Sequence, residues 1–367
     1  MADSEPTSPK QPLRLRRPKA LPQGSQPSGP CLAVPGAKPR RLDLPVVARR
    51  ALGHKFVCLS LSAPPDWESL PGQFINILCE SDVRALAASE GRPLDDSLDP
   101  WPRTTGLEIA RRWPVVRRPY SVSRIVRSGD RFGIEILVRA VGSGSRFIQS
   151  RPIGSSLNVV GPLGNHFTPP EDDRLCILVG GGCGVAPIFG LADYLVEAGK
   201  RCLCFFGASD LGDMAVTFRE PPAPTGDRVV PTDLVNEFAR LRQGGAPLRR
   251  GVARIGVRTV VATEDGGAGF HGRVTVALRT YLGDVWKGEP LALYGCGPTP
   301  MLKVLSEMAI ERRLPCQLSL ERFMGCGIGV CLSCAMKRRD PVSEKGWTYR
   351  LTCRDGPVVE AGEIIWD

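Results

Sequence analysis

The sequence predicts an α+β protein of several domains, in which an antiparallel β-barrel is followed by a doubly wound α/β domain and a small cysteine-rich module. Three observations carry this prediction. Short strand-like segments separated by turn residues fill the region up to residue 170, and apolar runs alternate with helices from residue 171 to 315. Four of the thirteen cysteines crowd near the end of the chain, between Cys326 and Cys353. At 367 residues, the chain is long enough for two or three compact units.

We expect residues 1–44 to form a basic, proline-rich tail that does not fold. Residues 1–41 hold nine prolines and eight Lys or Arg, against two acidic residues, and show no apolar periodicity from which a core could form. This stretch carries six of the ten net positive charges, so the charge of the whole chain says little about its folded part. No aromatic residues interleave with its charges to stack on bases, which argues against nucleic-acid binding.

Neither a secretory signal nor a membrane span is expected. The first forty residues lack the continuous apolar core that a signal peptide needs. The uncharged stretch from Leu175 to Leu191 is interrupted in its middle by Gly180, Gly181, Gly182, Gly184 and Pro187, and a span would need about twenty apolar residues. We therefore expect a cytoplasmic protein, whose thiols bind metal or stay reduced.

The predicted barrel covers residues 45–170. Its strand-like segments are bounded by turn residues such as Pro71-Gly72 and Gly161-Pro162, a pattern typical of antiparallel strands. The segments are Phe56–Leu61, Phe74–Leu78, Tyr120–Val122, Ile134–Val138 and Ser156–Val160. Residues 82–115, with several prolines and two tryptophans, interrupt this pattern, and we expect them to be an inserted surface excursion.

The sequence pattern changes near Arg174, within the first residues of the predicted α/β domain, which spans residues 171–315. Apolar runs that alternate with helices indicate a parallel, doubly wound sheet. The expected strands are Leu175–Val179, Cys202–Phe206, Arg258–Ala262 and Pro290–Tyr294, and the expected helices are Ala186–Ala198 and Pro300–Glu311. Residues 316–367 are assigned to the cysteine-rich module, although Cys316–Leu320 could supply one more strand.

The most specific motif is a run of three cysteines with a distant fourth. Cys326, Cys331 and Cys334 have the spacing C-x4-C-x2-C, and Cys353 follows nineteen positions later, which is the plant-type [2Fe–2S] pattern. The glycines between the cysteines allow the loop to bring three thiolates together, since positive φ costs glycine little. A structural zinc site is the alternative, but it prefers two Cys-x2-Cys pairs and only one is present. Purely structural cysteines are the remaining alternative.

A second motif, Arg118-Pro119-Tyr120-Ser121, begins a predicted strand and fits a flavin site. The arginine could pair with a pyrophosphate, the aromatic ring could cover the isoalloxazine, and the hydroxyl could reach its polar edge. The glycine-rich stretch from Arg139 to Ser145 is a plausible phosphate-binding loop. An exposed arginine before a half-buried tyrosine is the simpler alternative.

A third motif, a glycine-rich loop between a strand and a helix, fits a dinucleotide pyrophosphate at a helix N-terminus. It departs from G-x-G-x-x-G because Pro187 replaces the last glycine, and a tight turn is the alternative. A second glycine loop around Cys296 ends another strand at the same edge; Cys296 either faces the nicotinamide or is a small buried residue. The candidate NAD-binding residues are Gly180, Gly181, Gly182, Gly184, Val185, Ala186, Pro187, Gly295, Cys296, Gly297 and Pro298. Asp210, after the second strand, favours NAD over NADP.

Taken in this order, the three motifs resemble the ferredoxin-reductase superfamily. The ending resembles the electron-transfer subunits of the two-subunit, NAD-dependent dihydroorotate dehydrogenases, and the resemblance covers about residues 45–367. The matching residues are Arg118–Ser121, Gly161-Pro-Leu-Gly-Asn165, Gly180–Pro187, Gly269-Phe-His-Gly272, Tyr294–Met301, Glu321, Met324, Cys326, Gly327, Gly329, Cys331, Cys334 and Cys353-Arg-Asp-Gly-Pro357.

The resemblance implies FAD in the barrel, NAD on the sheet domain, and a [2Fe–2S] cluster ligated by Cys326, Cys331, Cys334 and Cys353. It implies an FMN-containing dihydroorotate dehydrogenase catalytic subunit as the partner, in pyrimidine (UMP) biosynthesis, and requires no general base in this chain. The FAD residues carried over are Arg118, Pro119, Tyr120, Ser121, Leu137, Val138, Arg139, Gly144 and Ser145.

Three features depart from the family pattern and put the partner contact in doubt: the basic tail, the 82–115 insertion and the extra length around 210–255. The alternatives are the same cofactor relay serving a hydrogenase, sulfite reductase or transhydrogenase subunit, or a zinc-stabilised binding module.

Overall fold

A computed structural model describes residues 38–79, 117–128, 131–216, 218, 221–235 and 256–366. Most of the expected tail, the whole of the 82–115 insertion and part of the extra length around 210–255 lie outside these residues. In the described part of the chain, no helix is long and apolar enough to cross a membrane.

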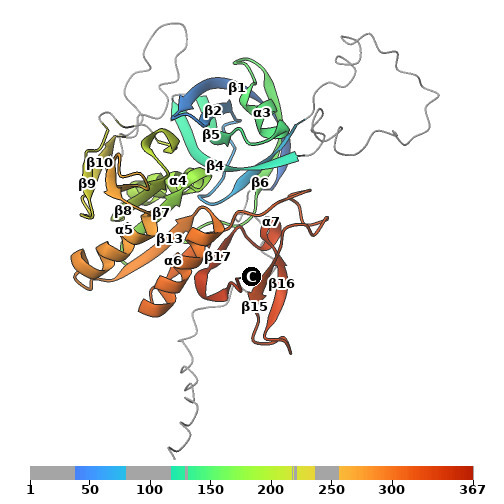
Figure 1. Ribbon diagram of the computed structural model, residues 1–367. Helices are drawn as coiled ribbons and strands as arrows, with labels where there is room; N and C mark the ends of the chain where they lie inside the picture. Colours follow the sequence, from blue (N-terminus) through green and yellow to red (C-terminus); the bar gives the residue numbers. More distant parts are fainter. Residues whose placement is uncertain are drawn as a thin grey trace, which may run out of the picture. The chain divides into compact units, whose positions relative to one another are not determined.

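The first domain is a closed antiparallel barrel, as the sequence predicts, and its six strands follow the order β1-β2-β5-β4-β3-β6 (Figure 1). Alternate residues point inward, and Leu59, Ile75, Ile77 and Ile136 are completely buried in its core. The strands are β1 Arg40–Leu52, β2 Phe56–Ser62, β3 Phe74–Leu78, β4 Arg117–Ser128, β5 Arg131–Arg139 and β6 Ser156–Leu163.

Strand β1 is not among the segments predicted from the sequence, and its residues 40–44 belong to the expected tail. Leu44 and Val46 face the barrel interior, Leu52 is buried in the core shared with α4, and neighbours such as Arg49 are exposed. The strand covers the barrel with one face only, so its outward positions are free to be basic and resemble the tail that precedes them. A short helix, α3 (Ser143–Gln149), stands where the sequence predicts only a loop.

The second domain is a mostly parallel sheet in the order β17-β14-β13-β7-β8-β11-β12-β9, with β10 paired to β11. Helix α4 packs on one face with Leu178 and Phe206, whereas α5 and α6 pack on the other face with Ile177 and Phe205. The predicted doubly wound arrangement is therefore confirmed. The strands are β7 Leu175–Gly181, β8 Cys202–Ala208, β9 Pro224–Gly226, β10 Thr232–Val235, β11 Gly256–Thr263, β12 Gly269–His271, β13 Leu291–Cys296 and β14 Cys316–Ser319. The helices are η1 Gly182–Gly184, α4 Val185–Glu197, η2 Leu211–Asp213, α5 Val274–Thr280, η3 Tyr281–Val285 and α6 Thr299–Arg312.

The cysteine-rich module is built on the edge of that sheet. β14 pairs with β13 in parallel and with the final strand β17 in antiparallel fashion, so residues 316–319 belong to the sheet rather than to the module. The hairpin β15–β16, red in Figure 1, and the short helix α7 complete the module. Its elements are β15 Ala335–Arg339, β16 Trp347–Leu351, α7 Thr352–Asp355, β17 Val358–Glu360 and η4 Ala361–Glu363.

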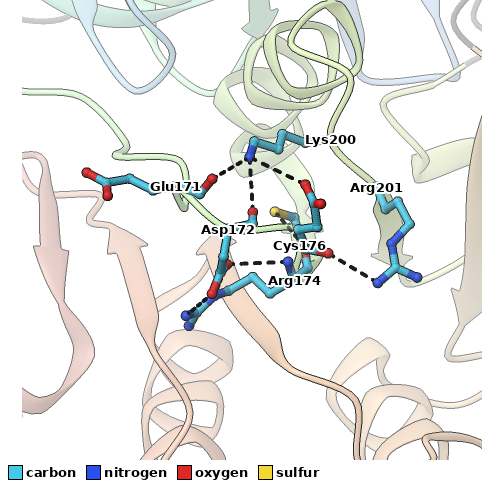
Figure 2. A network of polar contacts seen from close by, with 7 residues as sticks. Glu171, Asp172, Arg174, Cys176, Lys200 and Arg201 are labelled. Atoms are coloured by element: carbon cyan, nitrogen blue, oxygen red, sulfur yellow. Dashed lines mark hydrogen bonds and ion pairs between the residues drawn. The ribbon is translucent and has the colours of Figure 1, made fainter.

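The linker between β6 and β7 is fastened to the start of the sheet (Figure 2). The Lys200 ammonium donates hydrogen bonds to the carbonyl oxygens of Glu171, at 2.9 Å, and Asp172, at 3.0 Å. Arg174 pairs with the Asp172 carboxylate through two nitrogens, and this pairing lowers the pKa of Asp172 to about 2. Arg201 bonds the carbonyl oxygen of Asp173. These contacts fix the direction in which the chain enters β7.

Candidate cofactor sites

The Arg118–Ser121 motif lies in β4, and the Arg118 side chain passes next to the first turn of α3. Tyr120 and Ser121 pair with Ile75 and Phe74 of β3. A methyl group added at Gly144 would lie 3.2 Å from Cγ and 3.3 Å from Nε of Arg118. The glycine therefore leaves room for the Arg118 side chain, and two parts of the predicted pyrophosphate site come together.

Ser145 shapes the loop before α3. Its hydroxyl accepts hydrogen bonds from the backbone N–H groups of Val141 and Gly142, both at 2.9 Å, and donates one to the Gly142 carbonyl. The side chain is therefore engaged within the loop, so its contribution to a phosphate site is to hold the loop in place.

The end of β5 supplies Leu137, Val138 and Arg139, which face different surroundings. Leu137 packs in the core shared with α4, and Val138 is completely buried inside the barrel. Arg139 is exposed and lies over the ring of Phe56, 5.9 Å from its centroid. Val138 can thus meet a flavin only through its backbone, whereas the Arg139 guanidinium is accessible.

Tyr120 lies where the barrel meets the nucleotide domain. Burial raises the pKa of its phenol, and the Cys79 and Cys183 thiols are within electrostatic range. Cys183 belongs to the glycine loop after β7, far from Tyr120 in sequence. The aromatic ring predicted to cover the flavin is therefore within electrostatic range of the loop predicted to bind the dinucleotide.

The two glycine loops of the sheet contact each other, as the sequence predicts. β7 and β13 pair in parallel, with Cys296 opposite Gly180. A methyl group at Gly184 would overlap the carbonyl group of Cys296, so only glycine allows this approach. Gly182 has φ +56°, which also favours glycine. The loops thus form one surface at the carboxyl ends of the strands, where ligands of open α/β sheets bind.

The side chains of Val185, Ala186 and Pro187 are buried where α4 begins. Their part in a nucleotide site is therefore limited to the backbone.

A cluster of polar and thiol groups converges at this surface. Cys296 is 3% exposed, and its thiol is hydrogen-bonded to Ser319. The pKa of this thiol is raised mainly by burial and further by the nearby Glu321 carboxylate. Burial and then the Glu321 charge likewise raise the pKa of Cys183, to about 11. The pKa of Glu321 is itself raised by desolvation and is lowered in part by Arg139. Arg139 of the barrel and Glu321 after β14 therefore face the same site.

Sequence reasoning assigned no site role to Cys183 or Ser319 and quoted Glu321 only as part of a resemblance. A signal for Glu321 was present, because it follows Cys316–Ser319, the third strand to end at this edge. Cys183 stands inside the predicted glycine loop itself.

The acid expected to select NAD is used elsewhere. The Asp210 carboxylate accepts a hydrogen bond from the backbone N–H of Asp213 at 2.9 Å and caps η2. The loop after β11 lies beside it, because the N–H groups of Glu264 and Asp265 donate to the carbonyl oxygens after β8. The Glu264 side chain is 57% exposed and lies 4.0 Å from Arg273. Glu264 is thus the more accessible carboxylate.

The four cysteines of the terminal motif fall into two pairs. The Cys326 sulfur accepts backbone hydrogen bonds from Ile328, Val330 and Cys331, at 3.3–3.4 Å. The backbone N–H of Cys353 donates to the Cys334 sulfur at 3.5 Å. Among the described residues, no three His, Cys, Asp or Glu side chains are grouped as a single ion would need.

Two thiolates on each of two irons is the arrangement of a [2Fe–2S] centre. The loop geometry fits such a group, because Gly327 and Gly329 have φ +71° and +86° and turn the backbone N–H groups toward sulfur. The hydrogen bond with Ser333 holds the pKa of the Cys331 thiol well below its usual value. The donor set and its surroundings thus suit an iron–sulfur cluster.

The cysteine loop rests on the flavin barrel. Phe74 and Leu163 of the barrel share a core with Cys334, Leu351 and Cys353. Asn165, which follows β6, exchanges two hydrogen bonds with the backbone of Val358, at 2.7 and 2.8 Å. The two motifs Gly161–Asn165 and Cys353–Pro357, which are far apart in sequence, therefore lie together.

A cavity of about 440 Å³ lies elsewhere, among residues near the amino-terminal ends of β7, β13 and β14. Its polar groups bond one another: the Tyr294 hydroxyl donates to the Thr168 carbonyl, and the Gln317 amide donates to Glu360. The cavity is thus at the edge opposite the glycine loops and takes no part in the sites above.

Comparison with known proteins agrees with this geometry. Residues 321–365 match the model of the iron-sulfur cluster binding domain of dihydroorotate dehydrogenase B. The chain is 34% identical over 251 residues to the dihydroorotate dehydrogenase B (NAD(+)) electron transfer subunit of Caldanaerobacter subterraneus subsp. tengcongensis, covering 68% of this chain and 81% of that one. It is 35% identical over 257 residues to the subunit of the same name from Geobacillus kaustophilus, covering 69% and 81%.

Solved structures show a similar fold. An NADH-dependent reduced ferredoxin-NADP oxidoreductase, described in the context of flavin-based electron bifurcation, superposes with a TM-score of 0.61 at 22% identity and covers 90% of this chain and 91% of that chain. The ferredoxin reductase of carbazole 1,9a-dioxygenase superposes with a TM-score of 0.51 at 19% identity and covers 77% and 68%.

Proposed function

Since the chain belongs to the family of dihydroorotate dehydrogenase B (NAD(+)) electron transfer subunits, we propose that it is an oxidoreductase subunit that relays electrons to NAD⁺ in pyrimidine biosynthesis. The electrons come from the FMN-containing catalytic subunit that oxidises dihydroorotate. One observation carries the proposal: β4, which bears Arg118–Ser121, has both other sites next to it, because the cysteine loop bonds its neighbour β3, and α4, which begins directly after the glycine loop, packs on β4. The three sites thus follow one another in the order cluster, flavin, nucleotide.

The bound groups supply the redox chemistry, with FAD as the exchange point between single electrons and hydride, and the chain holds them in place. We propose Cys326, Cys331, Cys334 and Cys353 as the cluster ligands. Arg118 and the loop before α3 bind the FAD pyrophosphate, Tyr120 covers the ring, and Arg139 is within reach at the end of β5. The loops Gly180–Pro187 and Gly295–Pro298 bind NAD, with Cys296 and Glu321 near its nicotinamide end.

The catalytic subunit docks on the apolar side chains that surround the cysteine loop. Phe323 is 95% exposed, Val330 73%, Leu332 62% and Ile328 55%. Exposed apolar residues that gather in one place mark interaction surfaces. A partner bound there comes close to Cys331, which is exposed.

We place the complex in the cytoplasm.

The proposed domains are a barrel from Arg40 to residue 170, a nucleotide domain that extends through Ser319, and a cluster module from residue 320 onward. This division differs from the sequence-based boundaries at residues 45 and 316, because β1 begins at Arg40 and β14 is a strand of the sheet.

The test uses the purified full chain. We expect a flavin absorption spectrum, two irons and two sulfides per chain, and NADH oxidation with an artificial acceptor. The chain alone should not oxidise dihydroorotate, and addition of the FMN-containing subunit should restore transfer to NAD⁺. A colourless protein that contains zinc, or dihydroorotate oxidation by the single chain, would overturn the proposal.

A further inference from the structure

A row of polar and charged side chains runs from the barrel into helix α4. The Ser60 hydroxyl on β2 donates to the Glu135 carboxylate on β5 at 3.1 Å. Glu135 lies across from Arg124 of β4 in the sheet register. Arg124 Nε then donates to the Asp193 carboxylate of α4 at 2.5 Å. The last of these contacts crosses from the barrel to the nucleotide domain.

The Arg124–Asp193 ion pair, which joins the barrel to the nucleotide domain, is largely buried. The side chain of Arg124 is 8% exposed and that of Asp193 is 20% exposed, and Glu135 behind them is 1% exposed. A buried ion pair gains little net stability, because the desolvation of both charges opposes their attraction, but it tolerates only a narrow geometry. Another contact between the same domains, Lys55 with Asp213, leaves the lysine side chain 48% exposed and free to adjust.

The ion pair stands on the two elements that hold the predicted flavin and nucleotide residues. Arg124 lies three residues after Ser121 in β4, and α4 begins at Val185, directly after the glycine loop. Asp193 is eight residues along α4, about 12 Å from its start. The helix also touches the strand: a methyl group at Gly190 would lie 2.9 Å from the Ser123 carbonyl oxygen. A shift of α4 along β4 would therefore move the glycine loop relative to Tyr120.

We propose that Arg124 and Asp193 are positioning residues that set the nicotinamide against the flavin. They stand outside the predicted cofactor loops, and they act by fixing α4 on β4. Arg124 also lies across from the Glu135 carboxylate in the sheet register. This inference rests on the proposed function, because it requires FAD in the barrel and NAD on the sheet.

The experiment uses the FAD-loaded full chain and the variants Asp193→Asn, Arg124→Gln and their double mutant. Asp193→Asn keeps the shape of the side chain, so it is the variant least able to disturb folding. Arg201→Gln is the control, because it removes an exposed ion pair with Glu289 and a hydrogen bond to the Asp173 carbonyl, both at the edge of the sheet opposite the glycine loops. Three quantities are measured: FAD per chain, the Kd values of ADP-ribose and NAD⁺ for the oxidised protein, and the single-turnover rate constant of FAD reduction by NADH.

ADP-ribose lacks the nicotinamide, so it reports on the sheet domain alone. We expect its Kd and the FAD content to stay within twofold of wild type in every variant. The rate constant should fall at least about tenfold in Asp193→Asn and Arg124→Gln, since misplacement of reacting atoms by about 1 Å can cost a hundredfold. NAD⁺ should lose affinity relative to ADP-ribose, and the double mutant should lose no more than the stronger single variant. Arg201→Gln should change none of these values.

An unchanged rate constant per bound FAD in all variants would overturn the inference. Loss of FAD or of folding in all of them would overturn it as well, because the pair would then serve stability rather than orientation. Failure of the proposed function looks different: the wild-type chain would itself show no reduction of bound flavin by NADH.

Discussion

The side-chain amide of Asn76 donates a hydrogen bond to the carbonyl oxygen of Cys326 at 2.7 Å. Asn76 is 1% exposed and lies in β3, where it pairs with Pro119 of the predicted flavin motif. A methyl group at Gly327 would lie only 2.5 Å from the same amide nitrogen. One buried side chain thus joins the first cluster cysteine to the strand next to the predicted flavin motif.

Replacement of Asn76 by Leu should loosen the cluster loop. The carbonyl of Cys326 would lose its donor in a buried place, at a cost of about 1–3 kcal/mol in the free energy of unfolding. We expect a lower denaturation midpoint and faster release of iron to a chelator, with FAD still bound. Thr259→Val is a control, because the buried Thr259 hydroxyl also donates to a backbone carbonyl, that of Val257, but it lies in β11 outside the barrel and the cluster loop. Equal iron release from wild type and Asn76→Leu would show that the contact does not support the cluster.

The cluster ligands are tested by single replacements with serine. Cys353→Ser should remove or destabilise the [2Fe–2S] signal and lower the iron content, because a weaker ligand replaces a thiolate. Bound flavin should remain, since the barrel has its own core. Cys316→Ser is the matched control: Cys316 is also buried, but it lies in β14 outside the loop. A normal reduced-cluster EPR spectrum in Cys353→Ser would exclude this cysteine as a ligand.

The flavin site is tested at Arg118. Arg118→Ala should weaken FAD binding by about 1.5–3 kcal/mol, the range for a hydrogen bond to a charged group. Arg146→Ala, an exposed arginine on α3 three residues after Ser143, is the control and should retain FAD. The measurement is the FAD content after dialysis and the Kd on reconstitution. If the two variants retain FAD equally, Arg118 does not hold the pyrophosphate.

Nucleotide choice should depend on Glu264 rather than on Asp210. A carboxylate at this edge repels the 2′-phosphate of NADPH. Its removal would make the binding free energy of NADPH about 1 kcal/mol more favourable, and it would leave Arg273 available to that phosphate. We expect Glu264→Gln to raise the ratio of kcat/KM for NADPH over NADH about fivefold. Asp210→Asn should leave the ratio unchanged, because its carboxylate caps η2. The opposite pattern would return the role to Asp210.

The sequence is sufficient to predict elements whose residues are all buried or that carry short-range motifs. The run Leu175–Val179 is apolar because both faces of β7 are covered, and the cysteine spacing is local. By contrast, β1 resembles the tail, because its outward residues are arginines such as Arg49. The buried apolar positions of β1 are too few to give a recognisable strand pattern among those charges.

Long-range contacts were beyond the reach of the sequence. Arg124 and Asp193 are 69 positions apart, and neither stands in a motif. Asn76 and Cys326 are 250 positions apart, and only the packing of the cluster loop on β3 brings them together. Local patterns therefore predict which groups the chain binds, whereas the relations between the three sites depend on tertiary structure.

The final prediction concerns the docking of the catalytic subunit. Phe323 is 95% exposed and lies three residues before Cys326, so an interface at the cysteine loop would bury it. Replacement of a buried aromatic anchor commonly weakens the binding free energy by about 2 kcal/mol or more. Phe323→Asp should weaken binding of the FMN-containing subunit at least about thirtyfold and lower dihydroorotate-to-NAD⁺ transfer at limiting subunit concentration. NADH oxidation with a dye should persist, because the Phe323 side chain points to solvent and is not among the residues proposed to hold FAD or NAD. Val342→Asp is the matched control, since Val342 is 92% exposed but lies in the turn between β15 and β16. Equal binding by the Phe323 and wild-type chains, measured by calorimetry, would move the docking surface away from the cysteine loop.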